Sequence, residues 1–280
     1  MQDMAVIGGG TMGVGIAYVA ALAGGTVQVV EPDAARAETM TRTIATTLDG
    51  AVTRGKLDAD AAQAVARRVI RVATVEALDA GLPLVVESVP ERLDLKRDVL
   101  ARAAARTPHL LATNTSAMSI DTLVQSVRDP ATFLGLHFFN PVWSIKLLEI
   151  VRGTATSDAA LAQARAFGTA IGKETITVRD VPGFATSRLD FAAALEAMRM
   201  LEDGVASAED IDRAAVLAYR HPVGPLRLSD IVGLDVRLEV ARTLAAAHGP
   251  RFAPPALLAA MVAEGRLGAK TGRGFFDWPA

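Results

Sequence analysis

The chain has 280 residues, of which 51% are hydrophobic and 21% charged, and its formal net charge is −2. Such a chain can bury a full hydrophobic core and is long enough for two domains. The small net charge provides no broad basic surface, so we expect neither nucleic acid nor a membrane as a partner. The absence of cysteine excludes disulfides and thiolate ligands, and the four histidines form no ligand-like cluster, so we expect no metal.

The cellular location is suggested by what the sequence lacks. Its first residues do not resemble the basic segment and cleavage site of a secretory signal. No uninterrupted apolar run reaches the roughly 18 residues of a membrane span. We therefore expect a cytoplasmic protein.

Residues 1–180 alternate short β-branched runs with helix-like stretches. This alternation predicts an α/β domain with a mostly parallel sheet. The expected strands are 4–7, 26–30, 70–72, 84–88, 110–113, 133–139, 147–151 and 175–178. The expected helices between them include 11–23, 33–53, 91–106 and 158–171. The stretch 33–68 indicates two helices that break at Gly55, with Asp33 and Asp58 as their starts.

Residues 181–280 lose the β-branched runs and become rich in alanine and leucine. The pattern predicts a second, all-α domain with helices at 185–203, 207–219, 226–247 and 255–264. Its alanine-rich faces suit helix packing within one chain or between two chains. The glycine-rich tail that follows ends in aromatic residues, and we expect it to fold back over the rest.

The first expected strand leads into the loop Gly8-Gly9-Gly10-Thr11-Met12-Gly13, which matches G-x-G-x-x-G at the start of a helix. The first glycine permits a tight turn, the second lets a pyrophosphate approach the backbone, and the third lets the helix pack closely on the strand. The amides of the first helical turn then face the phosphates. A turn that serves packing alone is the alternative. We assign dinucleotide binding to Gly8, Gly10, Thr11, Met12 and Gly13.

The second expected strand ends in Glu31, 23 residues after Gly8. An acidic residue at this position usually binds the ribose hydroxyls of a dinucleotide and repels a 2′-phosphate. The next arginine is Arg36, so no basic residue stands beside Glu31 to favour the phosphate. The sequence therefore favours NAD over NADP as the cofactor.

A histidine and a carboxylate interrupt two apolar runs, 134–139 and 147–151. Strand alternation places His137 and Glu149 on faces where apolar residues are expected, and a buried carboxylate needs a partner. The Asn140-Pro141 step begins a break that can fold one run back toward the other. A turn centred on Trp143 puts positions 137 and 149 opposite each other, so we predict a pair in which the glutamate fixes the histidine tautomer and raises its basicity.

Several motifs follow one another in a characteristic order. They are the glycine loop, Asn114-Thr115-Ser116, His137-Phe138-Phe139-Asn140-Pro141, Glu149, Val181-Pro182-Gly183-Phe184 and Lys270-Thr271-Gly272. With these motifs the whole chain resembles the 3-hydroxyacyl-CoA dehydrogenase family, most of all its bacterial 3-hydroxybutyryl-CoA members. The resemblance implies a Rossmann-like NAD-binding domain over residues 1–180 and a helical substrate and dimerisation domain over residues 181–280. It also implies reversible, NAD-dependent oxidation of a short-chain L-3-hydroxyacyl-CoA in fatty acid metabolism.

The resemblance implies a role for each matching residue. His137 takes the proton of the 3-hydroxyl as hydride leaves C3, and Glu149 orients it. Ser116 contacts the substrate oxygen or the nicotinamide side. Ser187 stands where the family usually has an asparagine near the reacting carbonyl, and its shorter side chain leaves substrate identity open. Further cofactor contacts are implied for Glu91, Lys96, Ser116, Asn140 and Lys270.

Each of these assignments has a plainer alternative. Ser116 can cap the helix that begins near Ser119, and Glu91 with Lys96 can form a solvated helix face. Lys56 can meet the phosphates of coenzyme A or be an exposed loop residue. Two other functions also remain open: a dehydrogenase of a free small hydroxy acid, such as gulonate or carnitine, and a non-catalytic NAD-binding structural protein.

Overall fold

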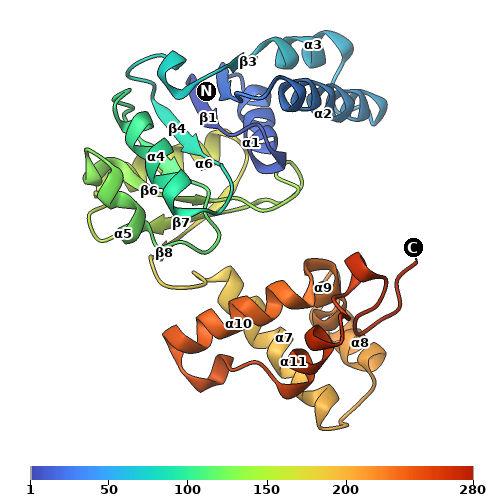
Figure 1. Cartoon of the computed structure of the whole chain (residues 1–280). Coiled ribbons are helices and arrows are strands. Elements are labelled where there is room, and N and C mark those ends of the chain that lie inside the picture. The colour runs from blue at the N-terminus through green and yellow to red at the C-terminus, as the bar shows by residue number, and fades with distance from the viewer. Residues whose placement is uncertain (1, 280) are drawn as a thin grey trace. The chain divides into compact units, whose positions relative to one another are not determined.

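The computed structural model describes residues 2–279, which divide into two compact units (Figure 1). The first unit ends at Val181 and the second begins at Pro182. The first is built on a mostly parallel sheet with helices and the second is all-α, so the predicted fold class is confirmed. None of the helices in residues 2–279 has the length and apolar character needed to cross a membrane.

The first unit contains an eight-stranded sheet with the order β3-β2-β1-β4-β5-β6-β7-β8. The strands are β1 Met4–Ile7, β2 Val27–Val30, β3 Val69–Val72, β4 Leu84–Glu87, β5 Leu111–Thr113, β6 Phe133–His137, β7 Leu147–Arg152 and β8 Glu174–Arg179. Every neighbouring pair is parallel except β6 and β7. All the expected strands are present, with small shifts at their ends.

Helices cover both faces of this sheet. Alternate strand residues, among them Val6, Val86 and Leu136, point into a core that they share with α1 (Thr11–Leu22) and α6 (Asp158–Ala170). The residues between them face α4 (Leu93–Ala104), which packs on β4 from the other side. The carboxyl ends of the parallel strands therefore meet at one edge of the sheet, where ligands bind in folds of this kind.

Two acidic side chains start the helices of the long crossover, as predicted. Asp33 accepts a hydrogen bond from the Arg36 amide at 2.8 Å and begins α2 (Ala34–Thr53). Asp58 accepts one from the Ala61 amide at 2.7 Å and begins α3 (Ala59–Arg67). The short elements of the two units are helix α5 (Ile120–Leu123) and the 3-10 turns Val75–Ala77, Val124–Ser126, Pro130–Thr132, Pro250–Phe252 and Ala269–Thr271.

The second unit packs its helices around their own apolar core. They are α7 Thr186–Glu202, α8 Ala208–Tyr219, α9 Pro225–Val232, α10 Leu234–His248 and α11 Ala256–Ala263. The prediction of a single helix over 226–247 is wrong, because the chain breaks at Gly233. That glycine has a φ of 104°, which side chains rarely allow. The apolar pattern continues across the break, so periodicity did not reveal it.

The aromatic tail folds back onto α9, as expected. Asp230 on α9 is fully buried and accepts hydrogen bonds from the amides of Phe275 and Phe276, each at 2.9 Å. The same carboxylate accepts the indole N–H of Trp278 at 2.9 Å. One buried carboxylate thus accepts hydrogen bonds from three donors of the tail and holds the tail to α9.

Candidate active site

The predicted register of β6 and β7 is confirmed, because His137 lies directly opposite Glu149. The two side chains are buried, with 6% of His137 and none of Glu149 exposed. The distance from His137 Nδ1 to Glu149 Oε2 is 2.7 Å. The antiparallel turn after Asn140-Pro141 therefore brings together two residues that each needed a partner.

The pair has a defined chemical polarity. An ionised carboxylate only accepts hydrogen bonds, so Nδ1 of His137 carries the proton that points at Glu149. The basic lone pair of the neutral ring then lies on Nε2. A buried carboxylate at 2.7 Å also stabilises the imidazolium that forms when Nε2 takes up a proton. This geometry suits general base catalysis.

The turn between β6 and β7 packs on α1, the helix that follows the glycine loop. Val142 is 1% exposed, and a Cβ on Gly15 of α1 would come within 2.7 Å of its side chain. Trp143 meets Tyr18 of α1 edge to face, with ring centroids 5.9 Å apart. The small residue Gly15 on α1 thus permits the turn that follows the histidine-bearing strand to dock on the helix that begins at the glycine loop.

The same turn is held by Lys173, a buried residue just before β8 that sequence patterns did not single out. Its ammonium donates to the carbonyl oxygens of Val142 and Ile145. Burial lowers the pKa of Lys173 from its usual value. In the sequence it looks like an ordinary cation at the end of a helix, so only the fold reveals its two carbonyl partners.

The glycine loop borders a cavity of about 920 Å³ at the carboxyl edge of the sheet. Gly8 has a φ of 114°, and a Cβ there would lie 2.6 Å from the Ser88 carbonyl oxygen. A Cβ on Gly13 would collide with the Gly8 carbonyl oxygen, whereas Gly10 faces open space. The loop therefore requires its first and third glycines for packing and leaves room for a phosphate group at the second.

The first turn of α1 supplies the donors for such a phosphate. Gly10 is the N-cap and has no side chain to satisfy the first amides of the helix. Thr11, Met12 and Gly13 form this first turn, and Met12 also lines the cavity. The backbone therefore fits a dinucleotide pyrophosphate through its shape and its partial positive charge.

Glu31 directly follows β2 and lines the same cavity. Its carboxylate is held by the amides of Gly9 at 3.2 Å and Asp33 at 3.0 Å, one on each oxygen. A carboxylate oxygen can accept more than one hydrogen bond, so both can still receive a hydroxyl. Arg36, in the first turn of α2, lines the same cavity, and its backbone amide donates to Asp33. The placement suits the ribose role predicted for Glu31.

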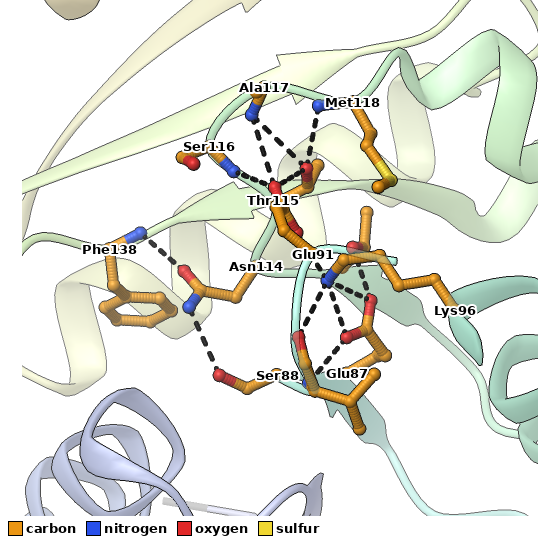
Figure 2. Close-up of polar contacts among 12 residues, drawn as sticks. Glu87, Ser88, Glu91, Lys96, Asn114, Thr115, Ser116, Ala117, Met118 and Phe138 are labelled. Carbon is orange, nitrogen blue, oxygen red and sulfur yellow. Dashed lines mark hydrogen bonds and ion pairs between the residues drawn. The ribbon is translucent and has the colours of Figure 1, made fainter. Parts of the chain in front are cut away.

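Glu91 joins the cavity to the turn that follows β5. Its carboxylate accepts from the Thr115 hydroxyl and, at 2.9 Å, from the Ser116 amide (Figure 2). Burial alone would raise the pKa of Glu91, but the Lys96 ammonium and the Thr115 hydroxyl outweigh it, so the pKa is below its usual value. Glu91 is thus an ionised acceptor beside Ser116.

Lys96 is not part of a solvated helix face. Its side chain has no exposed surface, and its ammonium lies 2.8 Å from Glu87 and 2.9 Å from Glu91. The suggestion that Ser116 caps the next helix is also wrong. The cap of α5 is Ser119, whose hydroxyl accepts from the Thr122 amide at 3.2 Å.

Asn114 connects three strand ends at this edge. Its side-chain oxygen accepts from the Phe138 amide at 2.9 Å, and its amide nitrogen donates to the Ser88 hydroxyl at 3.2 Å (Figure 2). Phe138 directly follows His137, so Asn114 links the cavity that it lines to the histidine-bearing strand. Sequence reasoning placed Asn114 in a motif but gave it no role. Asn140 lies beyond β6 and is exposed.

The two remaining candidates belong to the second unit. Ser187 is half-buried in the first turn of α7. Lys270 pairs with Asp235, with its ammonium 2.5 and 2.6 Å from the two carboxylate oxygens. Lys56 of the first unit is exposed. The roles of these three residues stay predictions. Over residues 2–279 no group of three or more histidine and acidic side chains is arranged to hold a metal ion.

Comparison with known proteins identifies the family of the chain. Residues 3–181 match the model of the 3-hydroxyacyl-CoA dehydrogenase NAD-binding domain, and residues 183–278 match that of the C-terminal domain. The chain belongs to the 3-hydroxyacyl-CoA dehydrogenase family. The expected NAD cofactor and the expected class, an NAD-dependent oxidoreductase of this family, are thereby confirmed.

Curated and solved members of the family cover the whole chain. It is 38% identical to 3-hydroxybutyryl-CoA dehydrogenase of Mycobacterium tuberculosis, over 99% of each chain. It is 39% identical to 3-hydroxyadipyl-CoA dehydrogenase of Escherichia coli, over all of this chain but only 60% of that one. The crystal structure of (S)-3-hydroxybutyryl-CoA dehydrogenase from Ralstonia eutropha matches with a TM-score of 0.95 at 35% identity, over 99% of each chain.

Proposed function

We propose that this protein catalyses the reversible, NAD-dependent oxidation of a short-chain L-3-hydroxyacyl-CoA to the 3-ketoacyl-CoA. The observation that carries the proposal is the buried His137–Glu149 pair, with its 2.7 Å contact. It lies at the carboxyl end of β6, the strand that Asn114 links to the cavity beside the glycine loop. A base and a dinucleotide cavity at the same sheet edge are the two components that alcohol oxidation needs.

The proposed reaction separates a hydride from C3 and a proton from the 3-hydroxyl oxygen. NAD, when bound, supplies the hydride acceptor. Nε2 of His137 takes the proton, and Glu149 holds the ring in the tautomer that leaves Nε2 basic. The carboxylate then stabilises the resulting imidazolium, which returns its proton in the reverse direction. Ser116, on the turn held by Glu91, binds the substrate oxygen.

The substrate class is supported by the family and by the names of the relatives. Those relatives act, by name, on 3-hydroxybutyryl-CoA and 3-hydroxyadipyl-CoA. Both are short acyl chains, and the adipyl chain is the longer one and ends in a second carboxylate. We propose 3-hydroxybutyryl-CoA as the preferred substrate of this chain, with Ser187 in the part of the site that contacts the acyl group.

A substrate panel tests the proposal. NADH formation should be fastest with L-3-hydroxybutyryl-CoA and slower with 3-hydroxyadipyl-CoA, free 3-hydroxybutyrate, gulonate and carnitine. Faster turnover of a free hydroxy acid would reject the acyl-CoA thioester as the substrate and support the alternative, a dehydrogenase of free hydroxy acids. Tight NADH binding without turnover of any 3-hydroxyacyl-CoA would instead support a structural role.

The cofactor preference depends on Glu31. The wild-type protein should use NAD with a higher kcat/KM than NADP, because the carboxylate repels a 2′-phosphate. Glu31→Ser should lower kcat/KM for NAD by about tenfold, the effect of losing a hydrogen bond to a charged group. The ratio of kcat/KM for NAD to that for NADP should therefore fall. Steady-state rates with both cofactors measure this. A wild-type preference for NADP would contradict the ribose role of Glu31.

We further propose a homodimer formed through the second unit. Its helices expose large apolar side chains, with 72% of Leu189, 72% of Leu217, 76% of Tyr219 and 54% of Ile231 accessible in the single chain. A second chain that covers these side chains would remove their apolar surface from water, which favours association. Sedimentation should give a dimer for the wild type and a monomer for Leu217→Glu, with Thr46→Glu on the exposed side of α2 as the control. A monomeric wild type would reject the proposal.

A further inference from the structure

Glu87 is a buried carboxylate for which the proposed reaction has no use. It is the last residue of β4 and has no exposed surface. It accepts from the Val89 amide at 2.7 Å, from the Thr113 hydroxyl at 2.7 Å, and from the Lys96 ammonium at 2.8 and 3.1 Å. An ionised group taken out of water is stable only with such a set of partners.

Lys96 is the cation that answers this charge, and its three protons are already engaged. Besides Glu87, the ammonium contacts Glu91 at 2.9 Å and donates to the Val89 carbonyl oxygen at 3.2 Å. Lys96 lies on α4, and its side chain is completely buried. Lys96 would have to give up one of these partners to touch a ligand. Its position therefore suits a residue that acts through a neighbour.

Glu91 passes this hold on to the turn 115–118. One of its carboxylate oxygens faces Lys96, and the other accepts from the Thr115 hydroxyl, the Ser116 amide at 2.9 Å and the Ala117 amide at 3.4 Å. The Thr115 hydroxyl oxygen in turn accepts from the Met118 amide at 2.9 Å. Figure 2 shows these contacts as one continuous network from the end of β4 to the turn.

We infer that Glu87 and Lys96 are positioning residues that fix Glu91 and, through it, the turn that carries Ser116. The inference rests on the proposed function only in taking Ser116 as the substrate contact. A carboxylate with free rotation could hold the turn in several ways. An ammonium that is itself immobilised by Glu87 leaves the Glu91 carboxylate one position, so the Ser116 side chain is presented in one orientation.

Stability and positioning can be separated by the choice of variants. Lys96→Met alone leaves the Glu87 carboxylate buried without its cation, which destabilises a fold strongly. The double variant Glu87→Gln/Lys96→Met removes both buried charges at nearly constant volume, and such replacements are often tolerated. In both variants, however, Glu91 loses its anchor. Arg213→Met is the matched control, because it removes an ion pair with Asp210 whose side chains are 71% and 62% exposed.

The experiment measures three quantities on the full chain: the melting temperature, amide hydrogen exchange over residues 115–118, and kcat and KM for L-3-hydroxybutyryl-CoA. We expect the double variant to melt close to the wild type, with Lys96→Met well below both. Exchange of the Ser116 and Ala117 amides should be about tenfold faster in the double variant, as a lost hydrogen bond to a charged group predicts, and kcat/KM about tenfold lower. Arg213→Met should match the wild type throughout.

The inference fails if the double variant recovers wild-type exchange and kcat/KM together with its melting temperature, because the pair would then serve stability alone. A double-mutant cycle supplies the second test. Adding Glu87→Gln/Lys96→Met to Glu91→Gln should change exchange and kcat/KM by less than about twofold, because these changes act on one contact and leave no buried charge without its partner. Effects that multiply would overturn the inference.

Failure of the proposed function has a different signature. A wild-type protein without turnover on any 3-hydroxyacyl-CoA rejects the reaction, whereas amide exchange still decides whether Glu87 and Lys96 position the turn. Exchange that is unchanged in every variant rejects the inference even when the wild type is active.

Discussion

His137→Gln is expected to lower kcat at least a hundredfold, while the dissociation constant for NADH changes little. General base catalysis by a positioned side chain contributes about 10²- to 10⁴-fold to rate, and glutamine has no basic nitrogen. Glutamine can still fill the space opposite Glu149 and donate to its carboxylate, so the buried charge keeps a partner. The fold and the cavity beside the glycine loop should therefore survive.

Stopped-flow rates of NADH formation and NADH fluorescence titration measure the two effects separately. Circular dichroism and the melting temperature show whether the variant is folded. His109→Gln is a suitable control, because His109 precedes the amino end of β5, whereas His137 lies at the carboxyl end of the parallel strand β6. A His137→Gln variant with a kcat within threefold of the wild type would remove the histidine from the mechanism.

Glu149→Gln is expected to lower kcat by about a hundredfold with little change in KM. The carboxylate, which has no exposed surface, lies 2.7 Å from His137 Nδ1, accepts the hydrogen bond of its proton and offsets the positive charge formed in the transition state. A glutamine amide can instead donate to Nδ1, which moves the ring proton to Nε2 and blocks the base. It also supplies no negative charge.

The control for this variant is Glu174→Gln, which removes an exposed carboxylate at the start of β8. Single-turnover rates show whether the loss lies in the chemical step, and nitrogen-15 chemical shifts of the His137 ring report its tautomer. A wild-type tautomer together with a wild-type rate in Glu149→Gln would show that the charge of Glu149 is not needed.

Local patterns accounted for much of the fold. The alternation of β-branched and helical stretches predicted every strand of the sheet, and a period of two placed His137 and Glu149 away from the apolar face that carries Leu136. Both properties follow from neighbours in the sequence, because side-chain direction in a strand is set by its backbone geometry. The glycine loop was equally local, since the Gly8 carbonyl oxygen in the same loop leaves no room for a side chain at Gly13.

Local patterns failed where the partner is distant in sequence. The helix over 226–247 was predicted as continuous because an apolar stripe crosses Gly233, and only its positive φ in the folded chain ends α9 there. Glu87 and Lys173 were not singled out, since each looks ordinary among its neighbours. Their importance comes from partners that chain topology supplies: Thr113 from β5 for the glutamate, and the carbonyls of the β6–β7 turn for the lysine.

The sequence by itself determined the alternation of elements, the dinucleotide loop, the opposition of His137 and Glu149, and the family. These depend on short-range periodicity and on motifs with defined spacing. Only the tertiary structure decided that Lys96 is buried rather than solvated, that Glu87 neutralises it, and that Glu91 connects the pair to the Ser116 turn. The physical reason is desolvation: a charge is costly once the fold removes it from water, and packing decides which groups lose their water.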